Sequence, residues 1–231
     1  MIKVDLKSRS IHLMGSTITI SILHEDADSL LDQVFSLLRL YEKRFSANDD
    51  SSELMQINHA AGKHAVCVHP DLFELIELGK KHSLAPDSHL NITLGPLVQT
   101  WRIGFADAKV PSPKEIKQAL ALTDPECIEL DAAASSVFLT MEGMKIDLGA
   151  LAKGYIADKI AAFLRRQGVT SALINLGGNI LTIGLNEKNN RCWWIGIQNP
   201  SLPRGNDLAL LSIQDQSVVT SGIYERKLQV D

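Results

Sequence analysis

The stretch KIDLGALAKGYIAD, from Lys145 to Asp158, decides how the rest of the chain is interpreted. Its pattern predicts the end of a strand, then a turn, then a helix that begins near Leu148. Apolar residues recur there at helical spacing, which predicts one buried helix face, and Gly168 is a plausible stop. The predicted buried face consists of Leu148, Ala152, Ile156, Ile160 and Phe163.

Asp147 stands where the N-cap of this helix is expected. Its carboxylate could accept a hydrogen bond from the amide of Ala150 or of a neighbour. Gly149 and Gly154 lie close to the predicted helix start, although a glycine costs about 1 kcal/mol relative to alanine inside a helix. Both glycines therefore suggest that another segment or a ligand approaches the backbone, and exposed helix amides bind diphosphates. The stretch alone is equally consistent with an ordinary capped, amphipathic helix.

The composition is typical of a globular protein, with 231 residues, 45% hydrophobic and 22% charged. A net charge of −4 and the lack of a basic run argue against nucleic-acid binding. The three cysteines form no CxxC pair, which favours reduced thiols and a cytoplasmic location. The sequence shows no signal-peptide pattern and no apolar run of about 18 residues, so no membrane span is predicted.

Helical and alternating patterns follow one another along the whole chain. Helices are expected over residues 26–45, 70–81 and 113–122, with a short one after Ser52. Strands are expected over residues 11–23 with a kink at Gly15, and over 65–69, 171–176, 208–213 and 217–219. Two antiparallel pairs are expected, 127–130 with 136–140 and 180–185 with 193–198. Several hairpins without steady βαβ alternation predict an α+β fold.

Four further glycine motifs could serve either structure or function. Met14-Gly15-Ser16 lies in a predicted strand, where a bulge is the favoured interpretation and contact with a flat ligand the alternative. Gly95-Pro96-Leu97 is interpreted as a rigid turn that could also present its backbone to a ligand. Gly177-Gly178 follows a predicted strand and permits close backbone approach. Thr220-Ser221-Gly222 suits phosphate or hydroxyl contacts, or a simple turn.

Signatures of other enzyme classes are missing from the sequence. No HExxH, Walker loop, GxSxG or dinucleotide-binding GxGxxG pattern occurs. The seven histidines do not have metal-ligand spacing, and Trp193-Trp194 is interpreted as packing.

Seven motifs, taken in order, resemble the FAD:protein FMN transferase family, the ApbE-like flavin transferases. They are MGS, RFSANDDSSELMQIN, LNITLGPLVQTW, IDLGALAKGYIAD, INLGGNI, WWIGIQNP and VVTSGIYER. The resemblance runs from about Met14 to Arg226. It implies one ApbE-like domain over residues 1–231, with mixed or antiparallel sheets, flanking helices and a T-fold-like architecture.

The resemblance also implies a reaction. FMN would pass from FAD to a Thr or Ser of an acceptor flavoprotein, such as a fumarate-reductase-like subunit, through a phosphoester bond with release of AMP. Mg²⁺ would bind the FAD diphosphate. This chemistry depends on positioning and charge neutralisation more than on a covalent protein nucleophile. A homodimer is compatible with the sequence.

The resemblance assigns site residues by their positions in the motifs. Residues expected to bind FAD are Met14, Asn48, Gly95, Pro96, Leu97, Asp147 and Lys153, with Thr220, Ser221 and Tyr224 in the wall of the site. The backbone carbonyl of Ala150 is expected to ligate the metal. The resemblance assigns no residue as the catalytic group.

The chain departs from the family pattern at several positions. Asn48 stands where the family has an aromatic residue, and Asn91 and Asn179 stand where Asp is common. The sequence ends before a downstream His-x-x-Asp-Pro segment and before a later Asp and Thr that complete the metal site in the family. We therefore expect a truncated member with an incomplete metal site. The alternatives are a non-catalytic FAD-binding or interaction protein, and a remnant that does not fold alone.

Overall fold

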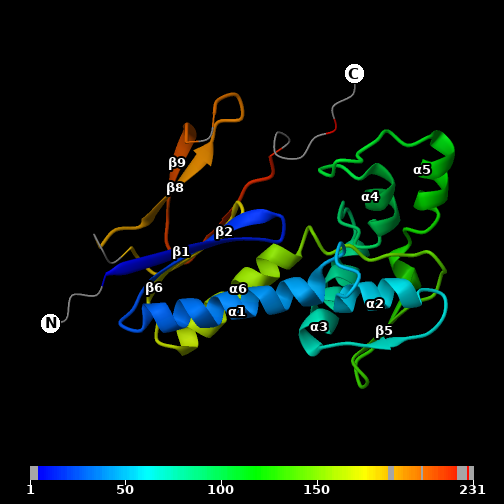
Figure 1. The fold of residues 1–231 in the computed structure, drawn as a ribbon, viewed down its shortest axis with the longest axis horizontal. Coiled ribbons are helices and arrows are strands. Elements are labelled where there is room, and N and C mark those ends of the chain that lie inside the picture. The colour runs from blue at the N-terminus through cyan, green and yellow to red at the C-terminus, as the bar shows by residue number, and fades with distance from the viewer. Residues whose placement is uncertain (1–4, 187–189, 204, 223–227, 229–231) are drawn as a thin grey trace. The chain divides into compact units, whose positions relative to one another are not determined.

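The computed structural model describes residues 5–186, 190–203, 205–222 and 228, drawn in Figure 1. The chain divides into two compact units. The first comprises Met1–Leu40 with Lys153–Glu225, and the second Tyr41–Ala152 with Arg226–Asp231. Each unit is described by itself, and a single domain over residues 1–231 stays a prediction.

The first unit is built on a five-stranded sheet with the order β1-β2-β6-β7-β10. Its strands are β1 (Leu6–Leu13), β2 (Ser16–Leu23), β6 (Ser171–Leu176), β7 (Asn179–Ile183) and β10 (Ser217–Val219). Every neighbouring pair in the sheet is antiparallel. Together with the helices this confirms the predicted α+β class.

Residues 11–23 form parts of two strands, so the prediction of one kinked strand was wrong. β1 and β2 make a hairpin in which Leu13 pairs with Ser16 across Met14 and Gly15. Both turn residues have positive φ angles, 52° for Met14 and 67° for Gly15. This is the backbone of a two-residue hairpin turn, whose twist matches that of the strands. Clear alternation begins only at Thr17, after the turn, so the sequence shows one strand plainly and Gly15 was interpreted as a kink in it.

Helices α1 (Ala27–Phe45) and α6 (Ala152–Arg166) supply apolar faces to the first unit. Figure 1 draws them on the same side of the five-stranded sheet. The core there contains fully buried isoleucines of β2 and α6 and an apolar stripe of α1. These residues are Ile18, Ile20, Ile22, Leu31, Val34, Leu38, Ile156 and Ile160. The predicted helix over 26–45 is confirmed to within one residue at its start.

The helix predicted from Leu148 begins later, at Ala152. The carbonyl of Leu148 accepts hydrogen bonds from the amides of Leu151 and Ala152, at 2.9 and 2.8 Å, which form a turn before the helix. Gly168 ends the helix as predicted. Its φ is +84°, and its amide and that of Val169 donate to carbonyls of the last turn.

A two-stranded sheet completes the first unit, made of β8 (Trp193–Gln198) and β9 (Asp207–Ile213). The predicted pairing of residues 180–185 with 193–198 was wrong. β7 lies between β6 and β10, so neither of its edges is free for β8, which pairs with β9 instead.

The second unit combines helices with a three-stranded sheet of order β3-β5-β4. Its elements are α2 (Glu53–Ala60), β3 (Val66–Cys67), α3 (Pro70–Ser83), α4 (Gly95–Trp101), α5 (Pro113–Leu120), η1 (Pro125–Cys127), β4 (Ile128–Asp131) and β5 (Ser136–Leu139). The predicted β4–β5 hairpin and the helices at α2, α3 and α5 are confirmed. Ser52 and Ser112 cap α2 and α5 by accepting from the backbone amides of Met55 and Glu115.

Residues 95–97 were interpreted as a turn, but they open α4. Proline suits the first turn of a helix because its missing amide would have no partner there.

Within the described ranges, no helix combines the length and the apolar character that a membrane crossing requires.

Candidate functional site

In the first unit, several predicted site residues meet at one end of the five-stranded sheet. Pairing of Ile18 with Leu176 brings the start of β2 to the end of β6. Pairing of Val219 with Asn179 brings the end of β10 to the start of β7. The amide of Thr220 then donates to the carbonyl of Gly178 at 3.3 Å. The β1–β2 turn, the β6–β7 turn and the residues after β10 therefore share this end.

The β6–β7 turn leaves no space for a side chain. Gly177 and Gly178 have φ angles of +65° and +91°. A Cβ on Gly177 would lie 2.3 Å from Oγ of Ser16 and 3.4 Å from Nζ of Lys153. The amide of Gly178 donates to Oδ1 of Asn175 at 3.0 Å, which fixes the turn. Exposed peptide groups with no side chain over them can be approached closely by a ligand.

The first turn of α6, which contains Lys153 and Gly154, lies beside the β6–β7 turn. The Lys153 ammonium lies beside Gly177, as given above, and a Cβ on Gly154 would be 3.6 Å from Nδ2 of Asn179. The first turn of a helix carries amides without helical partners and attracts anions. A lysine ammonium, helix amides and an Asn amide can together bind a phosphate group.

Ser16 and Asn175 were not singled out from the sequence as individual site residues. Oγ of Ser16 is buried and has no hydrogen-bond partner among the described residues. Asn175 holds the glycine turn. The signals that could have found them are the MGS motif and the Asn that precedes Leu-Gly-Gly.

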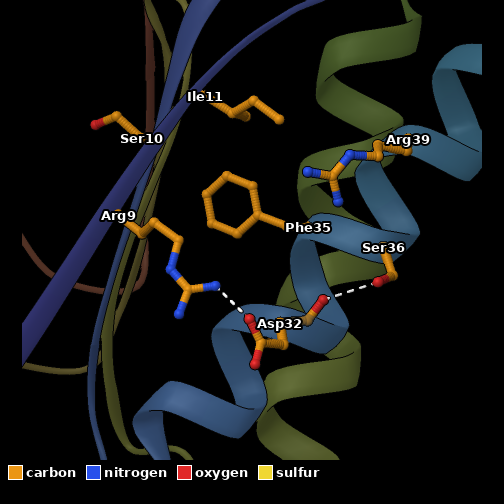
Figure 2. Close-up of a pocket in the computed structure, with 7 residues that line it drawn as sticks. All are labelled: Arg9, Ser10, Ile11, Asp32, Phe35, Ser36 and Arg39. Carbon is orange, nitrogen blue, oxygen red and sulfur yellow. Dashed lines mark hydrogen bonds and ion pairs between the residues drawn. The ribbon is translucent and has the colours of Figure 1, made fainter.

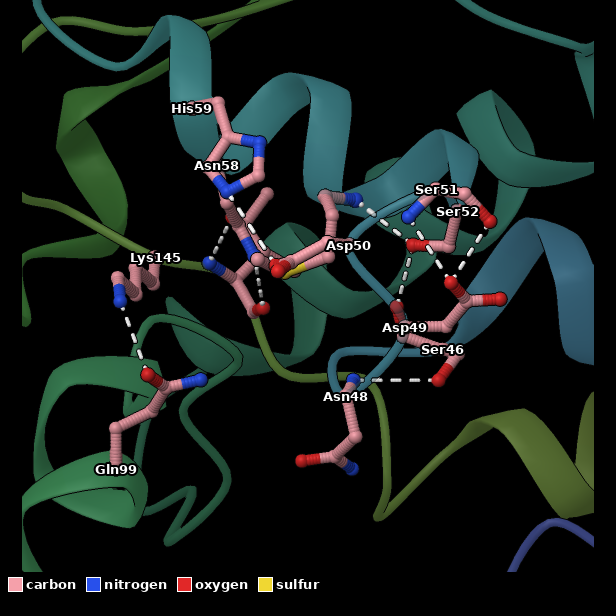
Figure 3. Close-up of polar contacts among 12 residues, drawn as sticks. Ser46, Asn48, Asp49, Asp50, Ser51, Ser52, Asn58, His59, Gln99 and Lys145 are labelled. Atoms are coloured by element: carbon pink, nitrogen blue, oxygen red, sulfur yellow. Dashed lines mark hydrogen bonds and ion pairs between the residues drawn. The ribbon is translucent and has the colours of Figure 1, made fainter.

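In the second unit, the segment from Lys145 to Ala150 is held on two sides. The buried side chain of Asn58 accepts from the amide of Ile146 at 2.8 Å and donates to its carbonyl at 3.1 Å. Figure 3 shows these contacts. The amide of Asp147 donates to the carbonyl of Ile92 at 2.8 Å. The backbone around Asp147 is therefore fixed.

Asp147 makes the kind of contact that was predicted, in a different setting. Its carboxylate accepts from the amide of Gly149 at 2.8 Å. Because α6 starts only at Ala152, this is a local Asx turn and not a helix cap. Gly149 and Ala150 are exposed at the tip of this turn, which leaves their peptide groups accessible to a ligand.

The Gly95-Pro96-Leu97 segment lies against Lys145 in the same unit. A Cβ on Gly95 would be 2.6 Å from both the Cβ and the carbonyl oxygen of Lys145, so only glycine fits. Nζ of Lys145 donates to Oε1 of Gln99 at 3.0 Å, as Figure 3 shows. Two segments that the sequence assigned to one site are thus neighbours.

Asn48 lies in the loop between α1 and α2, with its side chain exposed. Its amide donates to Oγ of Ser46 at 3.2 Å. Next to it, the carboxylate of Asp49 accepts from the hydroxyl and the amide of Ser51, and these bonds hold the pKa of Asp49 below its usual range. The loop is ordered by its own side chains, and Figure 3 shows it near Asn58.

The predicted site residues fall into two sets, one in each unit. Met14, Lys153, Thr220 and Ser221 belong to the first unit, and Asn48, Gly95, Pro96, Leu97, Asp147 and Ala150 to the second. Tyr224 lies outside the described residues.

The described residues do not by themselves fit a magnesium centre. Among them, no group of three or more His, Cys, Asp or Glu side chains lies close enough to share an ion. The Ala150 carbonyl would be one oxygen ligand, whereas Mg²⁺ in proteins is usually bound through one or two carboxylates together with substrate phosphates. The described residues would therefore retain Mg²⁺ only together with phosphate oxygens of a bound nucleotide.

A separate groove of about 500 Å³ lies between β1 and α1, and none of the predicted site residues lines it. Figure 2 shows its walls. Arg9 of β1 forms an ion pair with Asp32 of α1, and its guanidinium carbon lies 5.8 Å from the centre of the Phe35 ring. These contacts tie the edge strand to the helix.

Comparison with known proteins gives sequence relatives that are longer than this chain. A curated FAD:protein FMN transferase from Klebsiella pneumoniae (strain 342) is 45% identical over 224 residues, covering 97% of this chain and 68% of the relative. Another from Treponema pallidum (strain Nichols) is 38% identical, covering 89% of this chain and 60% of the relative. The chain thus spans about two thirds of the length of such relatives.

Solved structures agree with the sequence relatives. The ApbE protein from Thermotoga maritima has a TM-score of 0.88 at 26% identity, covering 98% of this chain and 74% of that one. The flavin transferase ApbE from Vibrio cholerae, as its H257G mutant, has a TM-score of 0.83 at 25% identity, with coverages of 95% and 71%. The sequence profile of the ApbE family matches residues 14–231. The chain therefore belongs to the ApbE family, whose curated members found here are enzymes named FAD:protein FMN transferase.

Proposed function

We propose that this chain carries the flavin-nucleotide site of a FAD:protein FMN transferase. In the proposed reaction, a Thr or Ser hydroxyl oxygen of an acceptor protein forms a bond to the phosphorus on the FMN side of the FAD diphosphate. The bond from that phosphorus to the bridging oxygen breaks, and AMP leaves with that oxygen. The hydroxyl proton passes to solvent or to the leaving phosphate. The product is FMN joined to the acceptor by a phosphoester.

The observation that carries this proposal is the Gly177–Gly178 turn beside Lys153, in a chain that belongs to the ApbE family. A diphosphate needs cationic and amide donors, and it needs backbone that can be approached without hindrance. In the proposed role, Lys153 binds a phosphate oxygen, while Met14, Thr220 and Ser221 line the same end of the sheet. We assign no catalytic base.

Residues of the second unit are proposed to contact FAD as well. Asp147 is proposed to hydrogen-bond to FAD, and Gly95, Pro96 and Leu97 to contact it through backbone and packing. The side-chain amide of Asn48 would contact FAD at the position where the family has an aromatic ring that stacks on it. The fixed backbone around Asp147 and Gly95 supports these roles, because a preorganised contact loses little entropy on binding.

We also propose that transfer depends on Mg²⁺, with the Ala150 carbonyl as one ligand and diphosphate oxygens as others. When bound, the ion would neutralise charge that builds up on the phosphoryl oxygens. A fumarate-reductase-like subunit as acceptor, a cytoplasmic location and a homodimer are further parts of the proposal. They rest on the resemblance and on the sequence composition.

Incubation of the chain with FAD, MgCl₂ and an acceptor domain tests the proposal. We expect the acceptor to gain the mass of one FMN, with one AMP released per FMN attached. Lys153→Met should weaken FAD binding about tenfold or more, because a charge-assisted hydrogen bond is lost. Lys159→Met on the same helix is the matched control, since Lys159 lies over the Tyr155 ring, 4.9 Å from its centre. It should change FAD binding less than about twofold. Absence of FAD binding would refute the proposal.

A second candidate function is FAD binding without transfer. It is favoured by the lack of a three-residue metal-ligating group among the described side chains, and by Asn at positions 91 and 179. FAD binding that ignores EDTA, with no mass gain on any acceptor, would support this candidate over the transferase.

A further inference from the structure

Ser16 places a hydroxyl on a face of β2 that is otherwise apolar. It is the first residue of the strand. Successive residues of a strand point to opposite faces, so Ser16 shares a face with Ile18 and Ile20, which are fully buried. That face packs in the core with α1 and α6, as described above. Ser16 therefore lies where this core ends and the candidate site begins.

Packing explains why the residue at position 16 is small, but it does not explain the oxygen. A Cβ on Gly177 would lie 2.4 Å from Cβ of Ser16, so a larger side chain on β2 would collide with the glycine turn. Alanine would fill the same space as serine. Yet Oγ of Ser16 is shielded from solvent and makes no hydrogen bond among the described residues. A buried hydroxyl without a partner lowers stability, and a role in binding a ligand would explain why it is present.

Lys153 brings a cation to the same point. A Cβ on Gly177 would be 2.3 Å from Oγ of Ser16 and 3.4 Å from Nζ of Lys153, so both groups border one spot above the glycine turn. They are close enough for a single phosphate group to accept a hydrogen bond from each. The stem of a lysine is flexible, so the ammonium can shift and open this spot to a ligand.

We propose that Ser16 is a phosphate-binding residue whose hydroxyl donates to a phosphate group of FAD that Lys153 also binds. This inference rests on the function proposed above and adds to it a residue that the family resemblance did not assign. A hydrogen bond from a hydroxyl to a charged phosphate oxygen is about twice as strong as one between neutral groups. Binding also gives the buried hydroxyl the partner that it lacks in the free protein, so the penalty of leaving it unpaired disappears.

The proposal predicts effects of opposite sign on folding and on binding. Ser16→Ala removes an unpaired hydroxyl, so without ligand its midpoint of urea unfolding should be unchanged or higher. The matched control is Ser171→Ala, in β6 of the same sheet. Ser171 is fully buried as well, but its Oγ donates to the carbonyl of Leu185 at 2.7 Å, so the loss of this hydroxyl should lower the midpoint. Ser171 begins β6, whereas Leu176 at the other end of the strand lies at the site.

Calorimetric titration with FAD in the presence of MgCl₂ measures the binding side. Ser16→Ala should bind FAD about tenfold more weakly, because a charge-assisted hydrogen bond is lost. Ser171→Ala should bind within about twofold of the unchanged chain. The double variant Ser16→Ala/Lys153→Met should lose less affinity than the product of the two single losses, because both side chains hold the same phosphate group.

Three results would overturn the assignment of Ser16 while the proposed function stands. A fall in the urea midpoint of Ser16→Ala as large as that of Ser171→Ala would show that the hydroxyl already has a partner in the free protein. Unchanged FAD affinity in Ser16→Ala would show that the ligand does not use it. Losses that multiply in the double variant would place Ser16 and Lys153 on different parts of the ligand. If the unchanged chain binds no FAD, the proposed function fails, and the role of Ser16 fails with it.

Discussion

At the scale of single residues, the contact between Gly177 and Ser16 tightly constrains the candidate site of the first unit. Gly177→Ala would place a methyl group 2.3 Å from Oγ of Ser16, at a φ of +65°. We expect a loss of about 2–5 kcal/mol in the free energy of unfolding, the sum of a left-handed backbone penalty and overpacking. Urea unfolding measures it.

Two variants separate the causes of this loss. Gly205 has a φ of +92°, and a methyl group there would meet no atom within 4 Å, so Gly205→Ala should cost only the backbone penalty of about 1–2 kcal/mol. Adding Ser16→Gly to Gly177→Ala should recover the overpacking part. Equal losses in Gly177→Ala and Gly205→Ala would show that the Ser16 contact is unimportant.

Asp215 makes the stability of the first unit depend on pH. Its carboxylate accepts from the amide of Gly184 at 2.9 Å and from Arg165 at 3.1 Å. The Gly184 bond foremost, with a smaller effect of Arg165, holds the pKa of Asp215 below its usual value. Because the folded pKa is below the unfolded one, the stabilisation is present above about pH 4 and is lost as pH falls through the folded pKa.

Asp215→Asn should therefore destabilise the protein at pH 7 and weaken its acid sensitivity. The loss should be below about 1 kcal/mol, since the side chain is half exposed and solvent screens it. Urea unfolding at pH 7, 5 and 3 measures this. Asp158→Asn, exposed on α6, removes the same charge elsewhere and is the control. An unchanged pH profile in Asp215→Asn would contradict the assignment.

At the scale of elements, one buried side chain holds the segment before α6. Asn58 of α2 is 6% exposed and pairs with both backbone groups of Ile146. Asn58→Ala would leave a buried amide and a buried carbonyl unpaired, which should cost about 2–4 kcal/mol. Hydrogen exchange at Ile146 and Asp147 should quicken as well. Asn48→Ala, exposed in the preceding loop, should change stability by less than about 0.5 kcal/mol. Normal exchange at Asp147 in Asn58→Ala would show that Ile92 alone holds the segment.

The sequence predicted those elements whose signals are local. Amphipathic periodicity predicted α1, α3 and α5. Gly168 predicted the end of α6, and the structure gives it the positive φ that glycine readily adopts there. The pairing of β8 with β9 was not predicted, because the sequence around β8 does not show that β7 already pairs with β6 and β10. The start of α4 was missed since Gly-Pro is typical of turns, although proline is equally at home in a first helical turn.

At the scale of the whole molecule, the order of the motifs predicted the family, and glycine pairs indicated where backbone would be accessible. The side-chain contacts within the site could not be predicted. Ser16 and Gly177 are far apart in the sequence, and only the β2–β6 pairing brings them together. From the sequence, Asp147 was likewise interpreted as a helix cap. The Asx turn that Asp147 makes comes just before the start of α6, so its polar side chain precedes the apolar face of that helix, as a cap would.

The proposed metal dependence gives a prediction that involves the whole molecule together with its substrate. The described residues hold no group of three or more His, Cys, Asp or Glu side chains that could share an ion, so Mg²⁺ should be retained chiefly through the FAD diphosphate. We expect calorimetry to detect Mg²⁺ binding only when FAD is present, since coupling between two ligands is reciprocal. EDTA should lower the rate of FMN transfer at least about 100-fold, and it should weaken FAD binding by the same factor by which FAD strengthens Mg²⁺ binding. Ala150→Val, which keeps the carbonyl, should behave as the unchanged chain does. Tight Mg²⁺ binding in the absence of FAD would instead reveal a carboxylate site of the protein's own and would contradict this account.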